Sequence, residues 1–182
     1  MTLADKYIRR RSMFNLEEAQ TYILKWIDDF VSQPNPDINN FPPCPFAKQA
    51  ILDNKVEFEV CEIKIDSYLK EKATRWNEDT DVCCIFVPNI NSTNLSVMVE
   101  NTNKLYLMEQ DFVVLEDHPD EEENINGVIM NNGKYPIVLM QRLSKIQMFS
   151  GILKKRGYYD VWSKEELDEV VNWRHHVDPV KS

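Results

Sequence analysis

A cysteine set between prolines is the strongest chemical signal in this sequence. Cys44 stands in the run Pro42-Pro43-Cys44-Pro45-Phe46-Ala47-Lys48. Proline suits the first position of a helix, where its missing N–H is not needed. If Pro45 begins a helix, Cys44 is its N-cap, and we predict that the helix dipole lowers the pKa of the thiol below its ordinary value of about 8.5. Such a sulfur is a nucleophile or a metal ligand; the alternative is a small buried residue at a tight turn.

Two further residues have side chains suited to chemistry. His118 follows Asp117 at the end of a short apolar segment. There it is a candidate general base or metal ligand, or simply a polar residue that ends a strand. Arg142 stands among apolar neighbours. An arginine in that setting either clamps a carboxylate or phosphate of a ligand or pairs with a buried carboxylate of the protein.

A metal ion is an open alternative, and its ligands would be Cys44, His118 and Asp117. The acidic segment 117–134 lacks the spacing of a calcium-binding loop, so we interpret it as a long solvated loop. The chain has no G-x-G-x-x-G motif, no Walker loop and only 4 glycines. A glycine-rich phosphate cradle needs more, so we expect neither NAD nor ATP as a cofactor.

The composition is that of a soluble globular protein, with 43% hydrophobic and 28% charged residues among 182. The net charge of −9 argues against nucleic acid as a partner. Arg9-Arg10-Arg11 is the dense basic run, and it belongs to a segment, 1–14, that we expect to be a basic tail. No apolar run approaches the roughly 20 residues of a membrane span, and no signal peptide is recognisable. We therefore expect a cytoplasmic protein with reduced cysteines and no membrane association.

The middle of the chain alternates between strand and helix patterns. Residues 56–63 alternate apolar and polar side chains, as a strand with one solvated face does. Residues 82–87 are apolar throughout, including Cys83 and Cys84, which is typical of a central strand, and 112–115 form a third strand. Segments whose apolar residues recur at helical spacing lie between these three strands.

Helical patterns also precede and follow this central part. Residues 15–32 are amphipathic, a short helix follows the prolines to about Leu52, and residues 92–109 are helical between the second and third strands. The predicted helices begin at the following caps or first residues, in chain order: Asn15, Pro45, Asp66 or Ser67, Pro136 and Ser163. The helix from Pro136 would place Leu139, Leu143, Ile146 and Leu153 on one face.

This order predicts an α/β (or α+β) fold. We expect a single compact domain, 1–182, with a three- or four-stranded, mostly parallel sheet flanked by helices. Ligands of such sheets bind beyond the C-terminal ends of the strands, where Asp117-His118 falls. We predict that Cys44 and Arg142 converge on the same edge as His118.

The motif residues bear a family resemblance. The run Pro43-Cys44-Pro45-Phe46-Ala47-Lys48 resembles the N-L-C-P-F-A-K signature of an uncharacterised bacterial family, domain-of-unknown-function family 1415. Three later segments follow in the family's order: Val87-Pro88 before a helix, Glu116-Asp117-His118-Pro119-Asp120, which is similar to F-H-P-D, and Tyr135-Pro136 with Arg142, which is similar to S-P-Y-P-T-L-H-L-L-R-E. The resemblance spans roughly residues 15–155. The family's histidine and glutamate in the last segment fall here on Leu139 and Leu143, so any chemistry they perform would be altered or lost. The resemblance strengthens the site hypothesis and implies no particular reaction.

Two classes of function follow from these residues. As an enzyme of unknown reaction, the protein would use Cys44 as nucleophile or ligand, His118 as base or ligand, and Arg142 as the anchor of an anionic small molecule. As a non-catalytic binding or adaptor protein, it would dock a protein partner on its acidic surface. The enzyme hypothesis requires that Cys44 and His118 share a cavity; if they do not, the binding protein is favoured.

Overall fold

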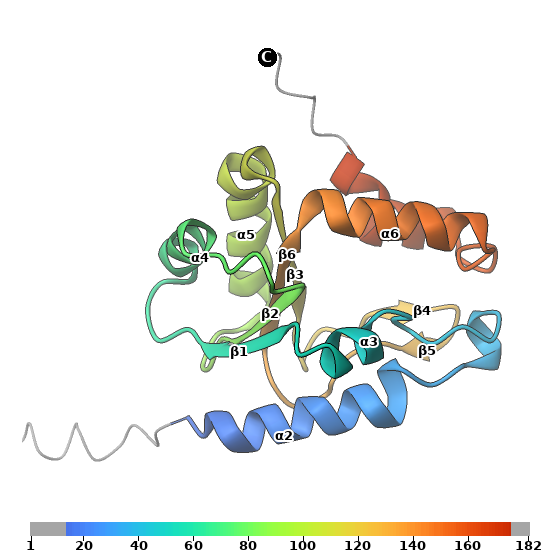
Figure 1. Ribbon diagram of the computed structural model, residues 1–182, viewed down its shortest axis with the longest axis horizontal. Helices are drawn as coiled ribbons and strands as arrows, with labels where there is room; N and C mark the ends of the chain where they lie inside the picture. Colours follow the sequence, from blue (N-terminus) through green and yellow to red (C-terminus); the bar gives the residue numbers. More distant parts are fainter. Residues whose placement is uncertain (1–13, 176–182) are drawn as a thin grey trace, which may run out of the picture.

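The computed structural model describes residues 14–175 and is built around a four-stranded sheet (Figure 1). The strands are β1 (Val56–Val60), β2 (Val82–Phe86), β3 (Phe112–Asp117) and β6 (Ile137–Arg142), and they lie in the order β1-β2-β6-β3. The predicted α/β class, with a small sheet flanked by helices, is confirmed. The predicted basic tail 1–14, which contains Arg9-Arg10-Arg11, falls outside the described residues except for Phe14.

Strand β6 takes the place of the first part of a predicted helix. Pro136 precedes β6, and helix α6 (Leu143–Lys155) begins only at Leu143. Within β6, Val138 and Met140 pack into the core on one face of the sheet, whereas Ile137 and Leu139 pack on the other. The prediction of one helix from Pro136 was wrong because a strand buried on both faces is apolar at every position. Periodicity alone does not distinguish such a run from a buried helix.

The insertion of β6 makes the sheet mixed. Strand β1 pairs with β2 in parallel, whereas β6 lies antiparallel between β2 and β3. Strands β1, β2 and β3 therefore point the same way, as the β-α-β-α-β order predicts. The pairing itself is not mostly parallel, because β6 separates β2 from β3. The C-terminal ends of β1, β2 and β3 share one edge with the N-terminal end of β6.

Helices α4 (Ile65–Thr74) and α5 (Ser92–Thr102) cover one face of the sheet, on the left in Figure 1. We call this the α4–α5 face. Helix α5 continues through a π-helical turn, η3 (Asn103–Leu107), and a 3-10 turn, η4 (Met108–Gln110), which together match the predicted helix 92–109. Helix α4 begins at Ile65 after Lys64, without a side-chain cap, so the predicted cap at Asp66 or Ser67 was wrong.

Helices α2 (Leu16–Trp26) and α6 belong to the opposite face, which we call the α2–α6 face, and α3 (Ala47–Leu52) lies between them in Figure 1. Helix α2 is extended by a π-helical turn, η1 (Ile27–Val31), and a 3-10 turn, η2 (Pro36–Ile38), follows. The predicted N-cap of α2 is confirmed, since the Asn15 side chain accepts a hydrogen bond from the Glu18 N–H. Helix α7 (Lys164–Val170) starts with the predicted Ser163–Glu166 capping box, and a 3-10 turn, η5 (Asn172–His175), follows it.

The predicted acidic loop 117–134 contains a small hairpin. Strands β4 (Asn124–Ile125) and β5 (Val128–Ile129) pair antiparallel across Asn126-Gly127. The φ angles of Asn126 and Gly127 are 48° and 86°, and a two-residue turn with two positive φ angles is the type I′ turn that Asn-Gly favours. Ile125 and Val128 are buried against Ile38, so this segment is anchored to the body of the protein. No helix within residues 14–175 has both the length and the apolar character that crossing a membrane requires.

Candidate functional site

The structure places Arg142 and His118 at opposite ends of the sheet. Asp117, the residue before His118, pairs with Ile137 at the start of β6, whereas Arg142 at its end pairs with Phe112. Five residues of strand separate the two ends by about 16 Å. The two side chains therefore do not converge on one edge as predicted. The reason is that β6 is an antiparallel strand, which carries Arg142 away from the C-terminal ends of its neighbours.

His118 has both ring nitrogens occupied by the backbone. Its Nε2 lies 3.0 Å from the carbonyl oxygen of Ile90, and its Nδ1 accepts the N–H of Asp120 at 3.1 Å. These partners match a neutral ring that donates from Nε2 and accepts at Nδ1. The side chain is 5% exposed. His118 thus ties the end of β3 to the loop before α5, and neither nitrogen is left to take a substrate proton.

The neighbouring Asp117 is likewise engaged with its own loop. One carboxylate oxygen accepts from the Asn131 side chain at 3.0 Å, and the other accepts from the backbone and side chain of Asn132 at 2.9 and 2.8 Å. Asn132 is buried and donates in turn to the Tyr135 carbonyl. Asp117 therefore fixes the end of the acidic segment, at Asn131 and Asn132, beside the end of β3.

Arg142 turns towards protein groups on the α4–α5 face. Its guanidinium lies 4.1 Å from the centre of the Phe112 ring and pairs with the carboxylate of Glu78. Cation–π stacking and the ion pair together fix its orientation. Arg142 thus has partners within the protein, and its carboxylate partner Glu78 is exposed rather than buried as one of the two predicted alternatives required.

Cys44 lines a cavity on the other face of the sheet and is the exposed one of the four cysteines. Helix α3 begins at Ala47 rather than Pro45, so Cys44 is not its N-cap. Burial raises the pKa of the Cys44 thiol, and hydrogen bonds from the N–H groups of Phe46 and Ala47 offset only part of this. The predicted lowering of the pKa was wrong because the helix has only 6 residues and the sulfur is enclosed by protein atoms. The Cys44 side chain is both accessible and surrounded by protein atoms because it faces the cavity rather than open solvent.

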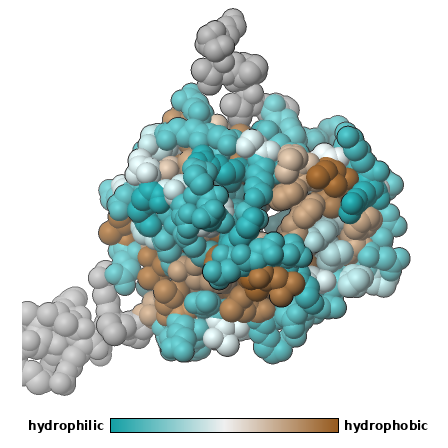
Figure 2. Space-filling view, in the orientation of Figure 1, coloured by the Kyte–Doolittle hydropathy of each residue, from teal (hydrophilic) through white to brown (hydrophobic). Residues whose placement is uncertain are grey.

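This cavity has a volume of about 630 Å³ and lies between the sheet, α2, α3 and α6. We call it the α2–α6 cavity. Its walls are mainly apolar, and they include Ile23, Trp26, Phe58, Leu139, Phe149 and Leu153. Figure 2 shows a hollow on this side of the molecule with apolar residues around it. A volume of roughly 300–1,000 Å³ is usual for small-molecule sites.

The charged residues that border the α2–α6 cavity are Asp53, Lys55, Asp81, Glu123, Arg142, Lys145 and Arg174. Lys145 is paired with Asp81. Burial raises the pKa of Glu123. Arg174 is 4% exposed, and its Nε donates only a long hydrogen bond of 3.4 Å to the Val171 carbonyl. No carboxylate within residues 14–175 forms an ion pair with Arg174.

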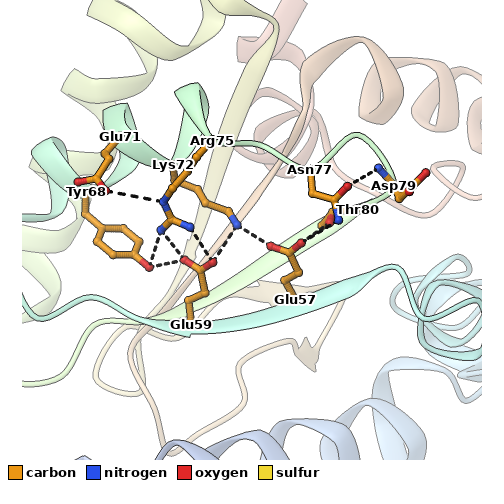
Figure 3. A network of polar contacts seen from close by, with 9 residues as sticks. All are labelled: Glu57, Glu59, Tyr68, Glu71, Lys72, Arg75, Asn77, Asp79 and Thr80. Atoms are coloured by element: carbon orange, nitrogen blue, oxygen red, sulfur yellow. Dashed lines mark hydrogen bonds and ion pairs between the residues drawn. The ribbon is translucent and has the colours of Figure 1, made fainter.

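A second cluster of chemically capable groups lies between β1 and α4 (Figure 3). Lys72 is 2% exposed, and its Nζ donates to Glu57 at 2.5 Å and to Glu59 at 2.9 Å. Burial alone would lower the pKa of Lys72, but hydrogen bonds to the two carboxylates outweigh it and the pKa is raised. Arg75 donates two hydrogen bonds to Glu59, whose pKa falls to about 2. The polar face of β1 is thus covered by α4 and neutralised, rather than solvated as predicted.

Glu57, Glu59 and Cys83 are the group within residues 14–175 whose ligand atoms lie close enough together to hold a metal ion. The ammonium of Lys72 already lies among the two carboxylates. Burial raises the pKa of Cys83 to about 12, so the thiol keeps its proton at neutral pH. A cation in the middle and a protonated sulfur do not suit a metal centre. The predicted ligands Cys44, His118 and Asp117 are not part of this group.

A hollow of about 540 Å³ borders His118, and we call it the acidic groove. Its walls carry Glu100, Glu116, Asp117, Glu121, Glu122, Glu123, Asp168 and Glu169. The Ser96 hydroxyl donates to Glu116, while the second carboxylate oxygen of Glu116 is buried without a partner. Burial raises the pKa of Glu116, and the nearby Glu121 and Glu100 raise it further.

Sequence reasoning missed Lys72 and Arg174. The alternating Glu57 and Glu59 indicated that one face of β1 is polar. The basic residues Lys72 and Arg75 on the next helix could have indicated that this helix covers the acidic face, because opposite charges pair. Arg174 gave no such signal, because its burial depends on how the chain after α7 folds back against α6. There the Gln147 side chain donates to the Arg174 carbonyl at 2.9 Å.

No family model, no curated protein and no solved structure matches this chain. The resemblance to the C-P-F-A-K family stays an interpretation of the motif residues. The function must therefore be argued from the side chains.

Proposed function

We propose that this protein binds a small apolar molecule in the α2–α6 cavity. The observation that carries the proposal is the volume of about 630 Å³ with mainly apolar walls. Protein interiors pack densely, and voids larger than a water molecule are rare. The space is partly open to solvent, so an apolar ligand that fills it removes both its own surface and the apolar wall from water.

Water is a poor occupant of this space. An ordered water molecule needs two to four polar partners, and apolar cavities of comparable character stay dry while taking up small hydrophobic molecules. Apolar side chains make up most of the exposed wall, and Lys145 is already paired with Asp81. An apolar ligand gains about 0.8 kcal/mol for each methylene it buries, which is about fourfold in affinity.

The test is a titration of the protein with straight-chain alcohols of increasing length, followed by calorimetry. We expect affinity to rise about fourfold per methylene until the cavity is full. The variant Ala50→Trp introduces a large side chain at the wall of the cavity and should abolish binding. Leu52→Trp is the matched control, since Leu52 lies on the same helix but is 70% exposed. Absence of binding, or equal binding by both variants, would refute the proposal.

The enzyme hypothesis has less support than the binding hypothesis. His118 and Arg142 each have partners within the protein and lie at opposite ends of the sheet. Cys44 belongs to the α2–α6 cavity, whereas His118 borders the acidic groove. A Cys/His/Arg site on an anionic substrate would need these residues to move together.

The acidic groove supports a second candidate function, the docking of a basic protein partner. Eight carboxylates border it, and its Lys104 is paired with Glu100. Like charges so close together favour a cationic partner. Pull-down of a lysine-rich peptide that weakens steeply with salt, and that is lost when Glu121 and Glu122 are replaced by Gln, would support it. Salt-independent capture would contradict it.

A further inference from the structure

We infer that the ligand of the α2–α6 cavity is an amphipathic carboxylate whose head group pairs with Arg174. The inference rests on the proposed function and names its ligand class. Arg174 borders the cavity and is 4% exposed. Within residues 14–175 no carboxylate forms an ion pair with it. The guanidinium is thus a buried cation beside an apolar cavity, and the part of the chain that the structure describes offers it no paired carboxylate.

Arginine has no way to relieve this by losing its proton, because its pKa lies too high. Burial lowers the pKa of Arg174, which shows the unfavourable surroundings, while Tyr159 acts in the opposite direction. A buried charge is stable only when it is paired and hydrogen-bonded. An anionic group on the ligand would supply the pairing that no described carboxylate provides.

The other charged groups at the wall differ from Arg174 in this respect. Lys145 is paired with Asp81, and Arg142 is paired with Glu78 and stacked on Phe112. Glu123 also borders the cavity, and burial raises the pKa of its carboxyl. Lys55 borders the cavity too, but it is only half-buried, so water can solvate its ammonium group. Arg174 is therefore the fully buried cation at this wall that has no ion pair within residues 14–175.

A carboxylate suits this position because its two oxygens match the planar fork of guanidinium donors. The rest of the cavity offers apolar contacts such as Leu153, Trp162 and Val171. A head group that is charged and a chain that is apolar correspond to a fatty-acid-like molecule. We expect charge pairing to raise affinity at least tenfold over a neutral chain of equal length, as hydrogen bonds to charged groups do.

The experiment compares decanoate, decanol and decyltrimethylammonium by calorimetry at pH 8. We expect decanoate to bind at least tenfold more tightly than decanol, and the ammonium compound to bind most weakly. Arg174→Gln should abolish the advantage of decanoate over decanol, and Arg174→Lys should keep part of it. Arg156→Gln, at an exposed position after α6, is the matched control and should change nothing.

The outcomes separate the inference from the proposed function. Equal binding of decanoate and decanol to the unmodified protein would overturn the inference and leave the apolar cavity site standing. Failure of every chain to bind would overturn both. Should Arg174→Gln not fold, the comparison of the three probes on the unmodified protein still decides the question, and retention of the decanoate advantage in a folded Arg174→Gln would also overturn it.

Discussion

Replacing Lys72 by Met tests how the charged cluster between β1 and α4 is held together. The change keeps a long side chain of similar volume but removes the ammonium that Glu57 and Glu59 share. Lys72 is 2% exposed, so no water molecule easily takes its place. The expected result is a large loss of stability in a protein that keeps its fold.

The contacts set the size of the loss. Removing one partner of a buried ion pair costs about 3–5 kcal/mol, because the other charge is left without compensation. Glu59 keeps Arg75 and Tyr68, whereas Glu57 keeps only the neutral Thr80 and Asn77. The Glu57 side chain is 31% exposed, which lets water soften the effect. We therefore expect about 3 kcal/mol at pH 7, most of it from Glu57.

The loss should depend on pH. The pKa of Glu59 is lowered from 4.5 to about 2, and that of Glu57 is lowered as well. A lowered pKa in the folded state adds stability above the unfolded pKa, and this stability disappears as the pH falls from 4.5 towards 2. Without Lys72 the pKa values rise, so Lys72→Met has less of this stability to lose. The difference between the two proteins should be greatest at pH 7 and shrink towards pH 3.

Urea unfolding followed by circular dichroism at pH 7 and pH 3.5 measures these differences. Lys70→Met, on the exposed side of α4, is the control and should change stability by less than about 0.5 kcal/mol. The double variant Lys72→Met/Glu57→Gln removes the uncompensated charge and should recover part of the loss. If Lys72→Met behaves like Lys70→Met, or if its effect grows as the pH falls, the reasoning about the cluster is wrong.

Three further outcomes are expected. Iodoacetamide should label Cys44 in the native protein and leave unlabelled Cys61, Cys83 and Cys84, which are 5%, 0% and 2% exposed. The rate of Cys44 alkylation should keep rising above pH 8.5, because burial raises the pKa of the Cys44 thiol. Rapid labelling of Cys83 would contradict the sheet assignment. Ser163→Ala should lower the unfolding free energy by about 1 kcal/mol, since it removes the capping box of α7, and no change would mean that this helix end contributes little. A chelator should leave the Tm unchanged because Lys72 occupies the space among Glu57, Glu59 and Cys83, and a fall of several degrees would show a structural metal.

Most of the secondary structure could be predicted from local pattern. Asn15 and Ser163 start helices because their side chains satisfy the free N–H groups of the first turn, and this needs only residues three positions apart. The apolar run at β2 predicted a central strand because a strand that is covered on both faces is apolar at every position. β6 was misjudged because Leu139 and Leu143 fit a helix as well as a strand followed by a helix, and only its position between β2 and β3 decides between them.

For the candidate site, too, the sequence determined one part and the tertiary structure decided the other. Residue types alone indicated that Cys44, His118 and Arg142 have chemical capacity, and they indicated an acidic surface. Whether such groups are free depends on neighbours that are distant in sequence: Ile90 lies 28 residues from His118, and Glu78 lies 64 residues from Arg142. The tertiary structure gave His118 and Arg142 protein partners and, within residues 14–175, gave the Arg174 side chain no carboxylate to pair with. A side chain's reactivity is set by what surrounds it, and those surroundings form only when the sheet closes against its helices.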